Sequence, residues 1–186
     1  MIGPSVGATV AMRLARRARP PDAYVFLAGA AIPGEQVMAR QSRRIAATLP
    51  VPWRWFRRSV ERRQAADRAR LLASTGATLR VRRQDLPAQW FREYMSYDPA
   101  ADLVAINRPV LAVTGMKDVQ VDPADVAAIG RMVTGPFDGE TPDDLTHLLR
   151  RDQHSPGLHR YAGQLRVPVD ADLVERVASW TRAQFS

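Results

Sequence analysis

A serine near the start of the chain lies in a pattern typical of nucleophilic catalysis. Residues 3–7 read Gly-Pro-Ser-Val-Gly and fit the motif G-x-S-x-G, with Ser5 as the candidate nucleophile. The two glycines of this motif let a strand turn sharply into a helix and expose the serine side chain. A helix-forming segment at 9–18 follows, so the backbone N–H of Val6 would lie at a helix N-terminus, where it can stabilise an oxyanion. By itself the motif is short, and a flexible glycine-rich tail is the alternative interpretation.

A candidate acid follows a predicted buried strand. Residues 108–115 are mostly apolar, and Asp118 lies on the loop just after them. Open α/β sheets build their sites at the carboxyl ends of strands, so this position suits a catalytic carboxylate. The alternative is an aspartate that only orders its loop through local hydrogen bonds. A competing carboxylate, Asp122, is explained as the N-cap of a helix over 123–132.

Three histidines are candidates for the general base. His147 lies on a connection after an acidic loop, whereas His154 and His159 lie among polar and turn-forming residues. The pattern favours His147 only modestly, and each of the three is also compatible with an ordinary surface histidine. No spacing typical of a metal site occurs, so we expect neither a metal nor another cofactor.

The elements that would position these residues indicate an α/β fold. Residues 23–28 form a short, nearly continuous apolar run, the pattern of a strand buried on both faces of a parallel sheet. A second such strand is expected at 108–115 and a third at about 132–137. These strands alternate with predicted helices, the last of them over 170–185. The order predicts a small, mostly parallel sheet with helices on its faces.

Residues 35–97 differ in character from the rest of the chain. Helical patterns cover about 35–49, 57–74 and 86–97, with no convincing strand between them. Most of the aromatic residues lie in or beside this segment, where they either pack it together or line a pocket. They include Trp53, Trp55, Phe56, Trp90, Phe91, Tyr94 and Tyr97. We therefore expect a helical insertion.

Length and composition restrict the class of protein. A chain of 186 residues is long enough for one domain, and its 46% hydrophobic and 25% charged residues are ordinary for a globular protein. No run approaches the ~20 apolar residues of a membrane span, and no export signal is visible. The chain has no Cys, which excludes disulfides and fits a cytoplasmic protein.

The net charge of +8 is unevenly distributed. Residues 1–100 carry 18 Arg against seven Asp and Glu, and in the densest part, 54–83, ten Arg face only Glu61 and Asp67. A basic surface favours nucleic acid, but all but one of the 27 basic residues are Arg, which indicates a compositional preference, and we expect no nucleic-acid partner. Solvated helix faces are the simpler interpretation of this stretch, and an Arg-rich surface for acidic ligands or membranes is the alternative.

Together these segments resemble the α/β-hydrolase family. Ser5, Asp118 and His147 occur in that family's order, with buried strands and a helical insertion between them. The stretch 97–121 is the most specific part and resembles the serine esterase and serine-aminopeptidase-like branch. The likeness covers nearly the whole chain but only the C-terminal half of such an enzyme. It implies that Ser5 is the nucleophile, His147 the general base and acid, Asp118 the carboxylate that orients it, and the Val6 N–H an oxyanion donor.

The resemblance also implies a domain organisation and a reaction. Residues 1–34 and 98–186 would form the C-terminal half of the hydrolase core, and 35–97 would form a cap or lid over the acyl pocket. The expected reaction is hydrolysis of an ester or related acyl bond in a small-molecule substrate through a Ser-His-Asp triad.

Two departures from the family pattern predict an impaired or inactive enzyme. The half that supplies the second oxyanion donor has no counterpart before Ser5, and Pro4 stands where a central strand would use a backbone N–H. The alternative is a non-catalytic hydrolase fragment that requires a partner chain or associates with itself through an exposed sheet edge beside Met1 and Ile2.

Overall fold

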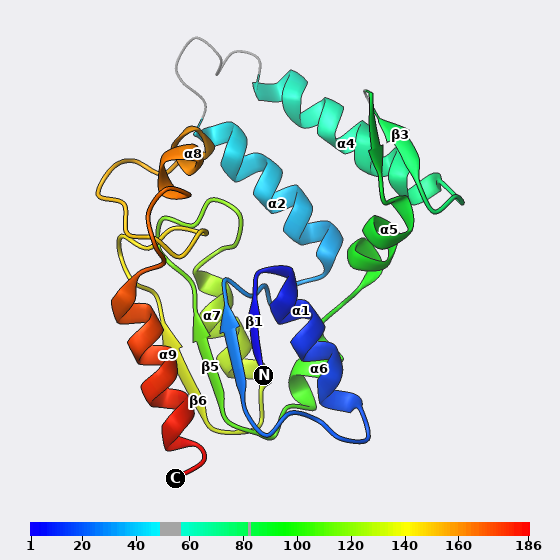
Figure 1. Ribbon diagram of the computed structural model, residues 1–186. Coiled ribbons are helices and arrows are strands. Elements are labelled where there is room, and N and C mark those ends of the chain that lie inside the picture. The colour runs from blue at the N-terminus through cyan, green and yellow to red at the C-terminus, as the bar shows by residue number, and fades with distance from the viewer. Residues whose placement is uncertain (49–56, 82) are drawn as a thin grey trace. The chain divides into compact units, whose positions relative to one another are not determined.

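Two compact units make up the computed structural model of the protein (Figure 1). The first, here the core unit, comprises Met1–Ile32 and Pro99–Ser186, and the second, the inserted unit, comprises Pro33–Asp98. The structure describes residues 1–48, 57–81 and 83–186. The predicted aromatic residues Trp53, Trp55 and Phe56 lie outside the described residues.

A four-stranded parallel sheet forms the centre of the core unit (Figure 1). Its strands, in spatial order, are β1 (Ile2–Pro4), β2 (Tyr24–Leu27), β5 (Val110–Val113) and β6 (Phe137–Glu140). The two middle strands, β2 and β5, are buried at every residue, as their apolar runs predict. Because every neighbouring pair is parallel, all four carboxyl ends lie at one edge of the sheet.

Helices cover both faces of this sheet, which confirms the predicted architecture. On one face are α1 (Val6–Arg13), α6 (Ala100–Val104) and α7 (Ala124–Met132), and on the other is α9 (Ala171–Ala183). Successive strand residues point to opposite faces, so Tyr24 and Phe26 enter the first core cluster and Val25 and Leu27 the second. The sheet is therefore sandwiched between two separate apolar cores.

Short helices complete the core unit. A 3-10 helix, η1 (Leu14–Arg16), continues α1, and η2 (Leu158–Arg160) with α8 (Tyr161–Gln164) lies between β6 and α9. The last helix starts where its sequence predicts, because the Asp170 carboxylate accepts the backbone N–H of Leu173 at 3.2 Å.

The inserted unit contains three described helices and a hairpin. The helices are α2 (Gly34–Ala47), α4 (Arg57–Ala73) and α5 (Ala88–Ser96), and the antiparallel hairpin consists of β3 (Leu79–Val81) and β4 (Gln84–Leu86). Leu71, Ala88 and Met95 form its small buried core. Trp90 stacks on Tyr94, with ring centroids 5.3 Å apart.

Two predictions about strands are wrong. No strand was expected within 35–97, yet β3 and β4 pair there; strands of three residues are too short to show a reliable alternation of apolar and polar side chains. The last strand of the sheet lies at Phe137–Glu140 instead of 132–137. Its residues Asp138, Gly139 and Glu140 lack the apolar run by which buried strands are predicted, because β6 is an edge strand.

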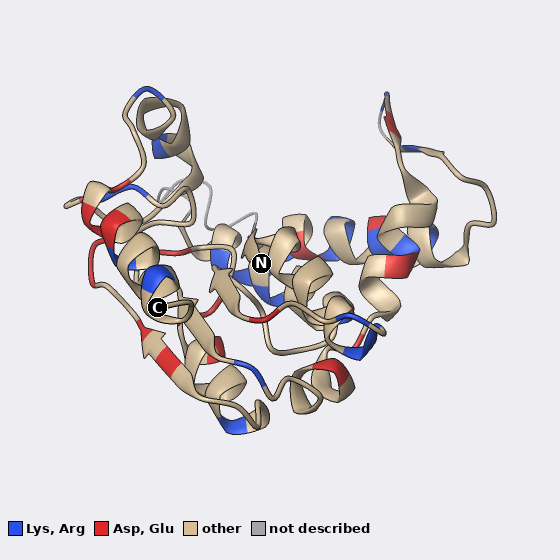
Figure 2. Ribbon diagram, turned by 60° about the horizontal axis from the view of Figure 1, so that its bottom comes forward, with Lys and Arg blue, Asp and Glu red and all other residues tan. Residues whose placement is uncertain are grey.

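Charged residues are distributed over several elements of both units (Figure 2). Six arginines of the basic stretch 54–83 belong to α4, whose residues, apart from Leu71, are exposed or half-buried wherever their side chains are described. This is the pattern of a solvated helix. In the part of the chain that the structure describes, no helix combines the length and the apolar character needed to cross a membrane.

The sheet interior should dominate the stability of the core unit. Leu111, in the middle of β5, is fully buried, so Leu111→Ala should lower the free energy of unfolding by about 2–5 kcal/mol in urea denaturation. Leu165, directly after α8, is 64% exposed, and Leu165→Ala should change the free energy of unfolding by less than ~0.5 kcal/mol. Equal losses at the two positions would contradict the described core.

Candidate active site

Ser5 lies on a strained turn between β1 and α1. Its φ and ψ angles are 51° and −119°, a combination that residues with a side chain rarely adopt. Its backbone N–H donates to the carbonyl oxygen of Leu27 at 2.7 Å, which fixes the turn to the neighbouring strand β2. Because α1 begins at Val6, the N–H of Val6 has no acceptor within the helix and is available to an anion beside Ser5.

The two glycines of the G-x-S-x-G motif are explained by this turn. A Cβ atom on Gly3 would lie 2.3 Å from the carbonyl oxygen of Gly7, and one on Gly7 would lie 3.1 Å from Cδ of Pro4. The strand and the first turn of the helix therefore approach so closely that a side chain at residue 3 is excluded. This close approach is the physical reason for the motif.

Pro4 fits the structure because of the direction in which its nitrogen points. The carbonyl of Met1 accepts from Val25 and the N–H of Ser5 donates to Leu27, so the odd-numbered residues of β1 pair with β2. The nitrogen of Pro4 consequently faces the opposite edge, where no strand pairs among the described residues. The missing N–H breaks no hydrogen bond of this sheet, because β1 is here an edge strand, where proline is tolerated.

The candidate acid Asp118 is almost completely buried and held by the backbone. One carboxylate oxygen, Oδ1, accepts the N–H groups of Gln120 at 2.7 Å and Val121 at 2.9 Å. The other, Oδ2, lies 2.8 Å from Nδ1 of His147. The loop thus fixes the orientation of the carboxylate toward the candidate base.

His147 occupies a loop after β6, and its side chain is 10% exposed. An ionised carboxylate can only accept hydrogen bonds, so the contact with Asp118 places the ring hydrogen on Nδ1. The second ring nitrogen, Nε2, then carries a lone pair. This is the tautomer that a general base requires.

A glycine permits the close contact between the loops of the acid and the base. A Cβ atom on Gly115 would lie 1.9 Å from the carbonyl oxygen of Leu145. The same carbonyl accepts the N–H of Lys117 at 3.1 Å. The loop after β5 and the loop after β6 are therefore joined through their backbones next to Asp118 and His147.

The three candidate residues follow three strands of one sheet. Ser5 comes after β1, Asp118 after β5 and His147 after β6, and the carboxyl ends of these parallel strands lie at the same edge. Asp118 and His147 are in contact, but the described residues include no hydrogen bond between Ser5 Oγ and His147. Such bonds are often long in enzymes without substrate and shorten when substrate binds.

The rival histidines lie in different surroundings. Nδ1 of His154 lies 2.9 Å from Oδ1 of Asp152, but its side chain is 68% exposed. His159 lies on η2 and is exposed. Among the described residues, no group of three or more His, Asp or Glu side chains is arranged to hold a metal ion.

Two buried polar residues near this site were not predicted. Asp152 and Gln164 are both 8% exposed. In the sequence Asp152 stands in a charged run, residues 150–154, that is typical of a surface loop. No pattern in the sequence distinguishes a buried aspartate in such a run from a solvated one.

Comparisons with known proteins identify the fold. The sequence matches no family model and no curated protein. Among solved structures, Est1E from Butyrivibrio proteoclasticus aligns with 100% of this chain and 60% of its own, with a TM-score of 0.58 and 16% identity. VinJ aligns over 78% of this chain and 58% of its own, with a TM-score of 0.50 and 14% identity. Mouse alpha/beta hydrolase domain-containing protein 10 aligns over 95% and 61%, with a TM-score of 0.45 and 14% identity.

The chain therefore has part of the α/β-hydrolase fold, as its sequence predicts. It spans 60% of the length of Est1E. At these identities the likeness concerns the fold, and the chemistry of this chain has to be argued from its own residues.

The strained turn at Ser5 should be visible in stability. Ser5→Gly and Ser5→Ala both remove the hydroxyl, but only glycine relieves the positive φ, so the Gly variant should be more stable by about 1 kcal/mol in urea denaturation. At Ser179, inside α9, the Gly variant should instead be less stable than the Ala variant by a similar amount, because glycine is a poor helix former. The same sign at both positions would contradict a strained turn.

Proposed function

We propose that this chain hydrolyses an ester or related acyl bond of a small-molecule substrate. Ser5 is the nucleophile, His147 the general base and acid, and Asp118 the group that orients His147. The observation that carries the proposal is the buried contact of 2.8 Å between Asp118 and His147, at the sheet edge where Ser5 occupies a strained strand-to-helix turn. The α/β-hydrolase fold supports the same reaction class.

In each half of the proposed reaction His147 acts first as a base and then as an acid. Ser5 Oγ attacks the acyl carbon while Nε2 of His147 takes its proton, and the N–H of Val6 donates to the resulting oxyanion. His147 then gives the proton to the leaving group, and an acyl-enzyme remains on Ser5. His147 then deprotonates a water molecule, which attacks the acyl carbon of this ester. As the tetrahedral intermediate collapses, His147 returns the proton to Ser5 Oγ, and the acid is released. Asp118 keeps Nδ1 protonated throughout.

We further propose that the inserted unit acts as the cap of the acyl pocket. It leaves the core unit after β2 and returns before β5. In the sequence it is therefore inserted between the two central strands, and between Ser5 and Asp118. It also carries aromatic side chains that suit an apolar substrate, and Trp90 among them is 42% exposed.

The proposed reaction should be slow in this chain. Among the described residues, Val6 is the single donor that we assign to the oxyanion, whereas two are usual in this fold. Loss of one donor typically lowers the rate by about 10²–10³-fold.

Covalent labelling tests the proposed triad directly. A fluorophosphonate probe should modify Ser5, Ser5→Ala should abolish the label, and Asp118→Asn should slow it by about 10³–10⁴-fold because it favours the wrong His147 tautomer. Asp122→Asn is the matched control: the carboxylate of Asp122 accepts the backbone N–H of Ala124 at 3.1 Å, at the start of α7, and has no role in the proposed triad, so this variant should label as the wild type. Mass spectrometry of the labelled peptide identifies the site. Absence of label, or label on the Ser5→Ala variant, would refute the triad.

A second candidate function is self-association without catalysis, and an apolar groove favours it. The groove has a volume of about 430 Å³ and is lined by residues of β1, β2 and α9 and of the connection before α9. Its lining includes Ile2, Leu27, Leu149, Leu173, Val174 and Val177. Ile2 is 50% and Val174 is 56% exposed, so the groove presents apolar side chains to solvent beside an edge of β1 that pairs with no strand among the described residues. We propose a second copy of the chain as its occupant.

Size measurement in solution tests this second function. If two copies meet at the groove, Val174→Lys should shift the mass measured by light scattering from dimer to monomer, because it places a charge in the contact. Leu165→Lys introduces the same charge at a similarly exposed position just after α8, outside the groove, and should leave the dimer intact. A wild-type monomer at all concentrations would exclude self-association.

A further inference from the structure

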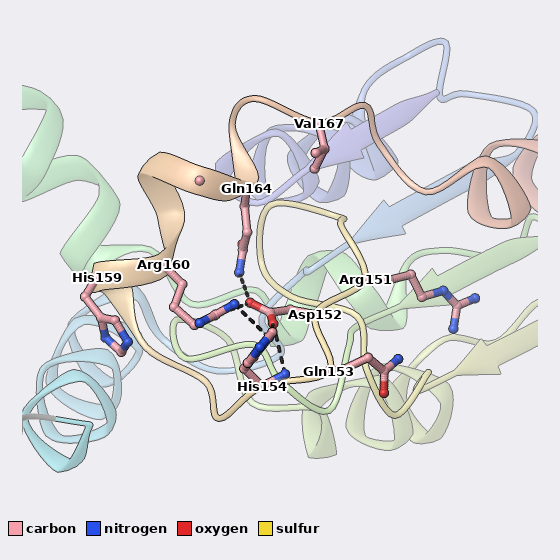
Figure 3. Close-up of a pocket in the computed structure, with 9 residues that line it drawn as sticks. Arg151, Asp152, Gln153, His154, His159, Arg160, Gln164 and Val167 are labelled. Atoms are coloured by element: carbon pink, nitrogen blue, oxygen red, sulfur yellow. Dashed lines mark hydrogen bonds and ion pairs between the residues drawn. The ribbon is translucent and has the colours of Figure 1, made fainter.

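Polar side chains surround the buried carboxylate of Asp152, in the segment after the His147 loop (Figure 3). Oδ1 of Asp152 accepts the backbone N–H of His154 at 2.9 Å and lies 2.9 Å from its Nδ1. Oδ2 accepts from Nε of Arg160 at 2.6 Å and from Nε2 of Gln164 at 2.8 Å. Two side-chain donors and one backbone N–H therefore converge on one carboxylate, and the ring of His154 lies beside it.

The cluster keeps Asp152 ionised. Burial alone would raise the pKa of Asp152, but the hydrogen bonds from Arg160, His154 and Gln164 outweigh burial and hold the pKa well below its ordinary value. Burying a charge is unfavourable unless its partners are complete, and here both carboxylate oxygens of Asp152 have close polar partners.

One branch of the cluster leads to the residue before His147. Gln164 donates with its amide nitrogen to Asp152, because a carboxylate can only accept, and so its oxygen faces Thr146. The hydroxyl of Thr146 lies 3.0 Å from this oxygen and 3.1 Å from the backbone carbonyl oxygen of Arg150, so these two acceptors share its one hydrogen. Thr146 is 3% exposed. Asp152 thus fixes which way Gln164 points, and Gln164 holds Thr146.

Another branch leads to the residue before Asp118. Lys117 extends its ammonium group to the backbone carbonyls of Asp152 and His154, the latter at 3.0 Å. Lys117 is the single lysine of the chain. The segment at Asp152 is consequently bound both to the loop of the acid and to the loop of the base.

The pair of Asp152 and His154 does not itself form a second catalytic dyad. Nδ1 of His154 also lies 2.7 Å from Nη2 of Arg160, a group that always donates. If that nitrogen accepts from the guanidinium, it has no hydrogen to donate to Asp152, unlike Nδ1 of His147 toward Asp118. No serine of the described residues is hydrogen-bonded to His154.

We infer that Asp152, Gln164 and Lys117 are positioning residues for the triad. Through Thr146 and the backbone of the 152–154 segment, they fix the position of the His147 loop relative to the Asp118 loop. This role rests on the proposed function of Ser5, Asp118 and His147. It provides a connection between base and acid in addition to their direct hydrogen bond.

Two substitutions at Thr146 separate positioning from general stability. Thr146→Val keeps the shape but removes the hydroxyl, and it should slow fluorophosphonate labelling of Ser5 by about 10–100-fold, the effect of a small misplacement of a catalytic group. Thr146→Ser keeps the hydroxyl and should restore labelling to the wild-type rate. Circular dichroism and thermal melts check that all variants are folded. Equal labelling of the Val variant and the wild type would overturn the inference.

A matched pair of aspartates tests the cluster itself. Asp152→Asn should weaken labelling as Thr146→Val does. Asp144→Asn is the control, because Asp144 lies at the other end of the same loop and its carboxylate binds Gln153 and Arg151 instead of Gln164. If Asp144→Asn slows labelling as much as Asp152→Asn does, the role of Asp152 is merely structural and the inference fails. If Asp152→Asn does not fold, the two Thr146 variants decide.

Proton NMR separates failure of this inference from failure of the proposed function. The hydrogen on Nδ1 of His147, shared with Asp118, should give a far-downfield signal that disappears in Asp118→Asn. Thr146→Val and Asp152→Asn should broaden or shift this signal, while Asp144→Asn should leave it unchanged. If the wild type does not label but the signal responds in this way, catalysis fails and positioning stands. A signal unchanged in Thr146→Val and in every folded Asp152 variant refutes positioning.

Discussion

Parallel pairing of the four core strands is the constraint on which the candidate site depends. Because β1, β2, β5 and β6 run in one direction, the chain must leave each of them at the same edge of the sheet. Ser5, Asp118 and His147 follow β1, β5 and β6 directly or after a short loop, so residues up to 142 positions apart are brought to one edge. The burial of β2 and β5 on both faces stabilises this arrangement.

Within that frame, contacts between backbones set the finer geometry. Gly3 lets β1 meet the first turn of α1, and Gly115 lets the acid loop meet the carbonyl of Leu145. At both places a Cβ atom would collide with backbone that has little freedom to move. The functional side chains are thus held by segments that approach more closely than side chains would allow. This explains why a strained φ at Ser5 persists in the folded protein.

The sequence predicts those parts of the fold that have a local signature. The apolar runs identify β2 and β5, and the order of Ser5, Asp118 and His147 suggests the family of the fold. The edge strand β6 was misplaced because half-solvated strands carry few apolar residues. Asp152 was missed for a related reason, since its burial results from Arg160 and Gln164, which are brought over it only by η2 and α8. Contacts between distant segments leave no periodic pattern in the sequence.

The three members of the candidate triad are not restrained equally. Asp118 and His147 are bound to each other, their loops are joined through the carbonyl of Leu145, and Lys117 links the acid loop to the segment after His147. Ser5 depends on β1, a strand of three residues that has one partner, β2, among the described residues. Local opening of a short edge strand requires less free energy than opening of a central one. Motion of β1 would therefore displace Ser5 while leaving Asp118 and His147 in contact. The proposed reaction consequently depends more on how well β1 is held against β2 than on the contact between the acid and the base.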